Sequence, residues 1–224
     1  MTGGIGSVAA TTPYAWPWDG GCPGARLALV VAGWDPGWRS RVDADPAAAA
    51  ERAVRTLVTA VAGACGTVVT VAHGPAPRTT GQRSFRLPAT ASVDPRRIDG
   101  AHAVGARRVD AAGIDGFHGS GLDATLRAAG ATHLLLAGHG LEAPVHSTLR
   151  SANDRGYECL LVLDASSPLR PDLVPASRSM VEMSGGIFGA VGLTADVLAA
   201  LVPTGTGTGM PTTSPVTTIP RSTP

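Results

Sequence analysis

The chain has 224 residues, of which 44% are hydrophobic, and a formal net charge of +1. This length and composition are typical of one domain with a sizeable buried core. The near-neutral charge, without a block of basic residues, argues against nucleic acid as a partner. All 18 basic side chains are arginines, so any mechanism that needs a lysine is excluded.

The cysteine pattern indicates a reducing compartment. Cys22, Cys65 and Cys159 lie far apart and form neither a CxxC pair nor a zinc-type spacing. Cys65 and Cys159 stand in apolar stretches, which predicts buried thiols. An odd number of cysteines without a disulfide pattern favours the cytoplasm. Residues 1–13 lack the features of a signal peptide, and no apolar run is long enough to span a membrane.

Both ends of the chain have compositions that do not favour packing. Residues 1–12 are mostly Gly, Ser, Thr and Ala, and we expect them to be flexible. Residues 203–224 are rich in Thr, Pro and Gly and carry almost no charge, so they bury too little surface to offset their ordering entropy. We expect a disordered tail there, and a single folded domain over residues 13–202.

Within this domain, the first strands and helix follow one another closely. Leu27–Ala32 is a continuous apolar run, as in a strand buried on both faces. Residues 46–62 form an amphipathic helix that begins with a proline in its first turn. Residues 67–72 are a second strand. Residues 74–105 are rich in Pro, Arg and Gly and predict an irregular excursion.

After the excursion, strands and helices alternate to the end of the domain. Ser120 is placed to cap a helix that contains Leu122 and Leu126. The further strands are expected at residues 132–137, 158–163 and 187–191, and the further helices at residues 144–153, 173–183 and 196–201. This alternation predicts a three-layer, Rossmann-like α/β domain, whose mostly parallel sheet of about six strands has helices on both faces. Ligands bind such sheets at the carboxyl ends of the strands.

Two segments carry a resemblance to a known family. Residues 138–160 (GHGLEAPVHSTLRSANDRGYECL) resemble the nucleophile segment of the isochorismatase-like cysteine hydrolases. Within them, ANDRGYECL at residues 152–160 is similar to the branch that includes biuret- and ureide-type amidohydrolases, and so is PYAWPWDG at residues 13–20.

The resemblance extends over most of the domain. DAAGIDGF at residues 110–117 resembles the lysine loop of the family, and GGIFG at residues 185–189 resembles its last strand. The similarity runs from about residue 13 to residue 201 and is weakest over residues 74–105.

The resemblance implies an Asp–Lys–Cys triad, in which a thiolate attacks an amide-type carbon while the aspartate takes the thiol proton. It places the aspartate at Gly33, the lysine at Ala111, six residues before Phe117, and the cysteine at Pro144. All three functional groups are therefore expected to be absent. Pro144 also lacks the backbone N–H that serves the oxyanion hole in the family, a donor worth about 3 kcal/mol in the transition state.

Five other residues could line a vestigial pocket: Asp35, His73, Phe117, His139 and Glu142. Each polar member has a structural alternative. Asp35 could start a turn at Asp35-Pro36-Gly37, and His73 could be a solvated residue at a strand end. His139 and Glu142 flank the nucleophile turn, and a glutamate near a helix start is favoured by the helix dipole.

Neither a metal nor a cofactor is expected. His73, His139 and His146 match no metal-binding spacing, and the glycines at positions 3, 4 and 6 neither follow a strand nor open a helix, as a dinucleotide fingerprint requires. The four tryptophans either pack in the core or in a subunit contact, or stack on a planar ligand: Trp16, Trp18, Trp34 and Trp38.

Two functions remain in view. The first is a pseudoenzyme of the isochorismatase-like fold that serves as a structural or regulatory subunit, or binds a small planar amide-like ligand. The resemblance implies a homo-oligomer, or a hetero-oligomer with an active paralogue; no nucleic acid or membrane partner is expected. The alternative is a cysteine-independent hydrolase that cleaves C–N bonds of small amides or ureides with relocated acid and base groups, such as Asp35, His73 or Glu142.

Overall fold

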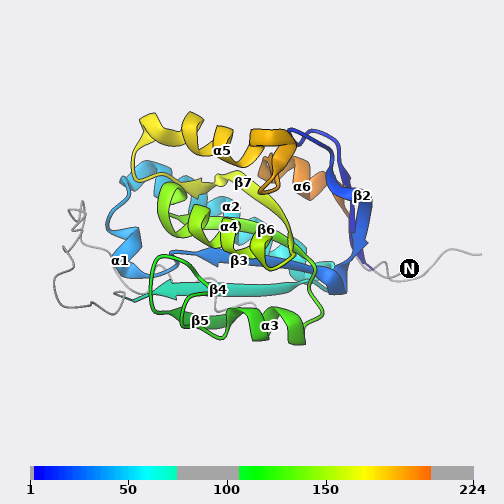
Figure 1. Ribbon diagram of the computed structural model, residues 1–224, viewed down its shortest axis with the longest axis horizontal. Coiled ribbons are helices and arrows are strands. Elements are labelled where there is room, and N and C mark those ends of the chain that lie inside the picture. The colour runs from blue at the N-terminus through cyan, green and yellow to red at the C-terminus, as the bar shows by residue number, and fades with distance from the viewer. Residues whose placement is uncertain (1–2, 75–105, 203–224) are drawn as a thin grey trace, which may run out of the picture.

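A central sheet of six parallel strands organises the molecule in the computed structural model, which describes residues 3–74 and 106–202 (Figure 1). The strand order is β5-β4-β3-β6-β7-β8. The strands are β3 (Leu27–Ala32), β4 (Thr67–His73), β5 (Arg107–Ala111), β6 (His133–His139), β7 (Glu158–Ser167) and β8 (Ala190–Gly192). The predicted three-layer α/β architecture with about six strands is confirmed.

Helices cover both faces of this sheet. They are α1 (Pro36–Arg39), α2 (Ala44–Gly63), α3 (Leu122–Ala128), α4 (His146–Asp154), α5 (Val174–Gly186) and α6 (Thr194–Ala200), with 3-10 turns at Gly24–Arg26 and Pro171–Leu173. Side chains alternate between the two faces of a strand. Leu29 and Val31 therefore pack with α2 and α6 on one face, whereas Ala28 and Val30 pack with α3, α4 and α5 on the other.

A second, antiparallel sheet of three strands closes one end of the domain. It contains β1 (Gly4–Val8), β2 (Trp16–Pro23) and β9 (Leu201–Val202), in the order β2-β1-β9. Ile5, Val8 and Trp16 join the core beneath α2 and α6. The expectation of a flexible segment over residues 1–12 therefore does not hold for β1, because its main chain pairs with segments near residues 16–23 and 201–202.

Several local predictions are also refined. Strand β5 was not predicted, and β8 is shorter than the expected strand at residues 187–191. Cys159 is buried as predicted, but the prediction of a buried Cys65 is wrong, because it lies exposed in the turn after α2.

The expectations for residues 75–105 and 203–224 lie outside the described residues. No helix in the described part of the chain has the length and hydropathy to cross a membrane.

The strand order places a topological switch in the middle of the sheet. From β3 the chain moves to β4 and β5 on one side, and it later returns to β6 on the other side of β3. The carboxyl ends of β3 and β6 flank this switch point, where ligands of open α/β sheets bind. Gly33 follows β3 there, and Gly140 follows β6.

Candidate functional site

Gly33 and Pro144 pack against each other at the switch point. Gly33 is buried and has a φ of 64°, a left-handed conformation that favours glycine. A Cβ added at Gly33 would lie 2.3 Å from the carbonyl oxygen of His139 and 3.4 Å from Cγ of Pro144. The space beside Gly33 is therefore already filled, and a larger side chain there requires the backbone to shift.

Pro144 reshapes the turn that leads into α4. It lies in a π-helical turn at Leu141–Val145. Proline has no N–H, so it cannot make the α-helical bond to the carbonyl of Gly140. The N–H of Val145 donates to that oxygen instead, at 3.3 Å, and the N–H of Ala143 donates to it at 3.0 Å. Both N–H groups that flank Pro144 are thus bound to Gly140, which accounts for the π-turn.

Ala111 ends β5 and is buried in an apolar cluster that contains Phe117 and Ala32. Ala32 is the last residue of β3 and immediately precedes Gly33. Its side chain joins the cluster of Ala111, whereas the Cβ position of Gly33 faces the backbone of His139. The sequence reasoning missed Ala32, although the alternation along β3 places it on the same face as Ala28 and Val30.

Asp35 binds backbone groups from two elements. Its Oδ1 accepts a hydrogen bond from the N–H of Trp38 at 3.0 Å, which caps α1, and its Oδ2 accepts one from the N–H of His73 at 3.0 Å. The interpretation of Asp35 as the start of a turn is confirmed. The carboxylate also ties the end of β3 to the end of β4.

His73 is held in a defined, neutral form. Its Nδ1 lies 2.8 Å from the carbonyl oxygen of Gly113. A carbonyl only accepts, so Nδ1 carries the proton and Nε2 is an unprotonated acceptor. Burial lowers the pKa of His73, although the Gly113 carbonyl and the nearby Asp35 and Asp115 carboxylates oppose this effect. Its Nε2 is buried and makes no hydrogen bond within the described residues.

His139 is a core residue. Its ring stacks on Trp34 with centroids 5.0 Å apart, and its Nδ1 lies 2.7 Å from Oγ of Ser167. Burial, together with the charge of Arg39, lowers the pKa of His139 to about 3. Arg39 itself forms an ion pair with Glu51. His139 is therefore neutral near pH 7 and far from the pKa that suits a general base.

Glu142 and Phe117 are also engaged in packing the fold. The two carboxylate oxygens of Glu142 accept hydrogen bonds from the N–H groups of Leu169 at 2.8 Å and Arg170 at 2.9 Å, so Glu142 anchors the segment after β7. Phe117 is buried against Tyr157, with ring centroids 6.1 Å apart. Asp35 and His73 are thus joined through the backbone, whereas His139 and Glu142 each serve a separate contact.

The side-chain types that bind metals are dispersed in the described part of the chain. Within residues 3–74 and 106–202, no three His, Cys, Asp or Glu side chains gather as metal ligands would.

Three of the tryptophans are buried, whereas Trp18 is 73% exposed. Core packing is thus confirmed for Trp16, Trp34 and Trp38.

A sequence model of the isochorismatase domain matches residues 28–196. The chain belongs to the isochorismatase family. The solved structures similar to this isochorismatase-family protein include an isochorismatase family protein from Burkholderia thailandensis, at 24% identity and a TM-score of 0.63, with 79% of this chain and 95% of that chain covered.

Two amidases of known structure are also similar. An N-carbamoylsarcosine amidase from Thermoplasma acidophilum has 21% identity and a TM-score of 0.58, with 75% of this chain and 96% of that chain covered. A nicotinamidase from Staphylococcus aureus has 14% identity and a TM-score of 0.57, with 75% and 98% covered. At these identities the likeness demonstrates a shared fold.

Proposed function

We propose that this isochorismatase-family protein is catalytically inactive and acts as a structural or regulatory subunit, or binds a small planar amide-like ligand without turnover. The turn at Pro144 carries the proposal. By resemblance it is the nucleophile turn, yet it presents no thiol, and the N–H groups of Ala143 and Val145 both donate to Gly140. A tetrahedral oxyanion would find no free backbone donor among these three residues.

The other two triad positions support the same conclusion. Gly33 and Ala111 are buried and carry no ionisable group, so neither supplies a base or a positive charge beside Pro144. Replacing buried charges with small apolar groups removes their desolvation cost. A scaffold without catalytic charges is expected to be more stable, which suits a structural role.

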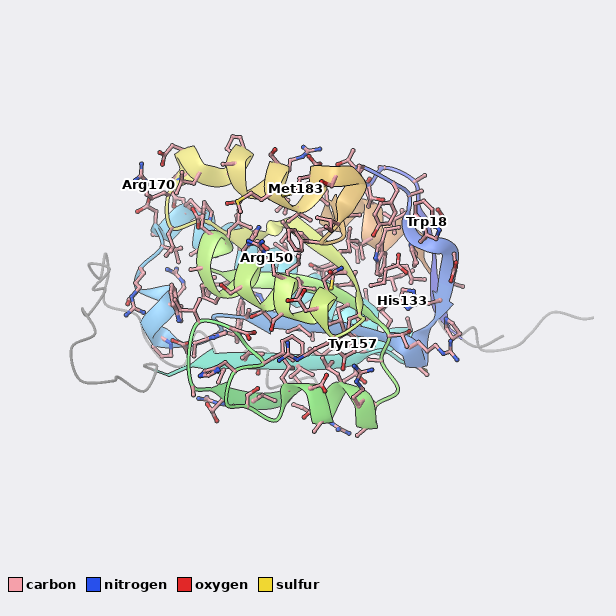
Figure 2. The ribbon with its side chains drawn as sticks, viewed as in Figure 1. Trp18, His133, Arg150, Tyr157, Arg170 and Met183 are labelled. Atoms are coloured by element: carbon pink, nitrogen blue, oxygen red, sulfur yellow. The ribbon has the colours of Figure 1, made fainter. Side chains whose placement is uncertain are left out.

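An exposed apolar surface supports a role in assembly. Helix α5 and its flanks contain four apolar side chains that are each more than a third exposed, and Trp18 of β2 is also exposed: Leu173, Met180, Met183 and Ile187. Figure 2 labels Met183 and Trp18. Apolar side chains gathered on a surface are typical of a protein interface. We propose that this surface contacts a second copy or an active paralogue.

A second candidate function is a hydrolase that acts on C–N bonds of small amides or ureides. The neutral imidazole of His73 favours it, because its buried Nε2 is an acceptor that makes no hydrogen bond with the described residues and could take a proton from water. This candidate requires a nearby oxyanion donor as well as a base, and Asp35 is occupied by backbone groups.

An amidase screen separates the two candidates. The purified protein is tested with biuret, an acyclic ureide and a simple primary amide, beside the His73→Ala variant. The His118→Ala variant is the matched control, because His118 is an exposed histidine in the same region. We expect no turnover by any of the three proteins. Turnover by the natural protein that is lost in His73→Ala but kept in His118→Ala would establish the hydrolase.

Restoration of the triad tests whether the loss of amidase activity is due to the three triad positions alone. Ala111→Lys and Pro144→Cys are combined with an aspartate at position 32 or at position 33. We expect the Ala32→Asp combination to gain amidase activity, because Ala32 shares a cluster with Ala111. We expect the Gly33→Asp combination to fold poorly, because its Cβ meets the His139 carbonyl. A folded Ala32→Asp combination without activity would show that more than the triad has been lost.

A further inference from the structure

Arg150 and Asp154 lie one turn apart on the exposed side of α4. Both residues are exposed, and neither forms an ion pair with another described residue. A cation that precedes an anion by four positions on a helix pairs less well than the reverse order. Asp154 is also the last residue of α4, where its charge meets the negative end of the helix dipole. A cation from another molecule would relieve this repulsion.

The guanidinium of Arg150 is held in an orientation that suits a carboxylate. It lies over the ring of Phe188, 4.2 Å from the centroid. Stacking on an aromatic ring restrains a guanidinium but leaves the N–H groups at its edge free to bind a carboxylate. Phe188 follows α5 in the chain, so the same contact joins the exposed side of α4 to the end of α5.

The exposed apolar side chains of α5 lie on the flank of the helix that is nearer α4. On the other flank, Arg178 and Glu182 both bind the hydroxyl of Thr12, which bridges to the edge strand β8. Met180 is two residues from each of them and therefore lies about 200° around the helix, on the opposite flank. Met183 follows it by about one turn. Figure 2 shows Arg150 on α4 and Met183 on α5, on neighbouring helices.

These residues form one surface, the α4–α5 face, with two charged and three apolar side chains: Arg150, Asp154, Met180, Met183 and Ile187. We propose that the α4–α5 face binds a second copy of this chain through a two-fold contact, in which Arg150 of each copy pairs with Asp154 of the other. This contact deepens the proposed function, on which it rests, because it commits the role in assembly to one partner.

A two-fold axis satisfies both charges at once. In an isologous contact, a residue that meets a second residue of the partner is itself met by the partner's first residue. Two antiparallel copies of α4 that cross at the level of Ala152 bring Arg150 opposite the partner's Asp154, and the reverse, because each lies two residues from that level, about 3 Å along the axis. The flanking methionines and Ile187 supply the apolar area that an exposed ion pair lacks.

Charge reversal tests the ion pairs in the full chain. The natural protein, Arg150→Asp and Asp154→Arg are compared by sedimentation velocity over a concentration series, with circular dichroism to confirm that each is folded. We expect the natural protein to dimerise, and each variant to raise the dimer Kd at least about 10-fold, because like charges then face each other at both pairs. Arg52→Asp is the matched control, since Arg52 is an exposed arginine of α2 on the other face of the sheet.

Mixing the two variants gives the most specific result. The Arg150→Asp copy has two acidic residues on its α4, and the Asp154→Arg copy has two basic residues. Each is mismatched with itself, whereas a heterodimer of the two matches both pairs. We expect an equimolar mixture to dimerise with a Kd within about threefold of the natural one. Two folded variants that remain monomers when mixed would exclude the reciprocal ion pairs.

A carboxylate placed among the apolar side chains tests the rest of the face. Met183→Glu should raise the dimer Kd at least about 10-fold, because the contact would bury an unpaired charge. Leu193→Glu is the matched control: Leu193 is 47% exposed, against 48% for Met183, but it precedes α6 on the other face of the sheet. We expect Leu193→Glu to dimerise as the natural protein does.

The contrary outcomes separate this contact from the proposed function. A natural dimer that neither Arg150→Asp nor Met183→Glu weakens would overturn the α4–α5 contact and leave assembly through another surface. A natural protein that stays monomeric over the whole concentration series would also overturn it, and would leave an active paralogue as the partner. The amidase screen reports on catalytic inactivity independently of both.

Discussion

The carboxylate of Asp35 accepts a hydrogen bond from the backbone N–H of His73, with 3.0 Å between Oδ2 and the nitrogen. The imidazole of His73 instead donates to the carbonyl of Gly113. Two of the side chains that the sequence offered as relocated acid and base groups therefore act through the main chain. Asp35 joins β3, α1 and β4, and its effects should appear first in stability.

Removal of the Asp35 carboxylate should weaken the fold. Asp35→Ala loses the cap of α1 and leaves the His73 N–H unpaired, and we expect the free energy of unfolding to fall by about 1–3 kcal/mol in urea titrations. Asp43→Ala is the matched control, because Asp43 precedes α2 without a side-chain capping bond. Its loss should be smaller, and equal losses would contradict the role given to Asp35.

Gly33 should tolerate substitution much less well than a glycine of similar conformation. Gly33→Ala combines a φ of 64° with a Cβ placed 2.3 Å from the His139 carbonyl oxygen. Gly130→Ala has a φ of 72° but no neighbour within 4 Å of the added Cβ, so it measures backbone strain alone. We expect Gly130→Ala to cost about 1 kcal/mol and Gly33→Ala to cost at least about 2 kcal/mol more. Similar melting temperatures for the two variants would show that the backbone at Gly33 yields easily.

Glu142 should prove to be a structural residue. Glu142→Ala removes the acceptor of the Leu169 and Arg170 N–H groups, and we expect a loss of about 1–3 kcal/mol in unfolding free energy and faster hydrogen exchange at these two amides. Asp172→Ala removes only an exposed ion pair with Arg170 and should change little. Unchanged exchange at Leu169 in Glu142→Ala would exclude the anchoring role.

Stability should depend on pH through the pair of His133 and Glu158, in which Nε2 of the ring lies 3.0 Å from Oε2 of the carboxylate. The pKa of His133 is raised to about 9 in the fold, so its contribution is complete below pH 6.5 and is lost as the pH rises to 9. The pKa of Glu158 is lowered, so its contribution is lost as the pH falls below its ordinary value of 4.5. We expect the natural protein to lose stability on the order of 1 kcal/mol between pH 6.5 and 9, since the pair is partly solvated. His133→Asn should flatten this part of the profile, and a profile as steep as that of the natural protein would assign the effect to another group.

The alternation of apolar runs and amphipathic helices was sufficient to predict the parallel sheet, because buried parallel strands have a distinctive composition. It missed β5, an edge strand in which Arg107, Arg108 and Asp110 are exposed and only alternate residues are buried. It also missed β1, a strand with two glycines that pairs with the next strand, β2, and with β9 from the other end of the domain.

The site was predictable only in part. The resemblance supplied the positions of Gly33, Ala111 and Pro144, but the hydrogen-bond partners of Glu142 cannot be read from a single sequence. Its partners are backbone N–H groups 27 and 28 residues away, and the type of a residue does not show where its backbone N–H binds. His139 likewise became a core residue only through Trp34 and Ser167, which the fold brings to it from neighbouring strands.

The closeness of Pro144 to Gly33 couples the effects of substitutions at the two positions. A cysteine alone at position 144 would leave a gap beside Gly33 where the proline ring now packs, and an aspartate alone at position 33 would strike the His139 carbonyl. Each of these substitutions made alone is thus expected to lower stability. The close packing therefore means that an aspartate at position 33 and a cysteine at position 144 would be accommodated only by substitutions made together.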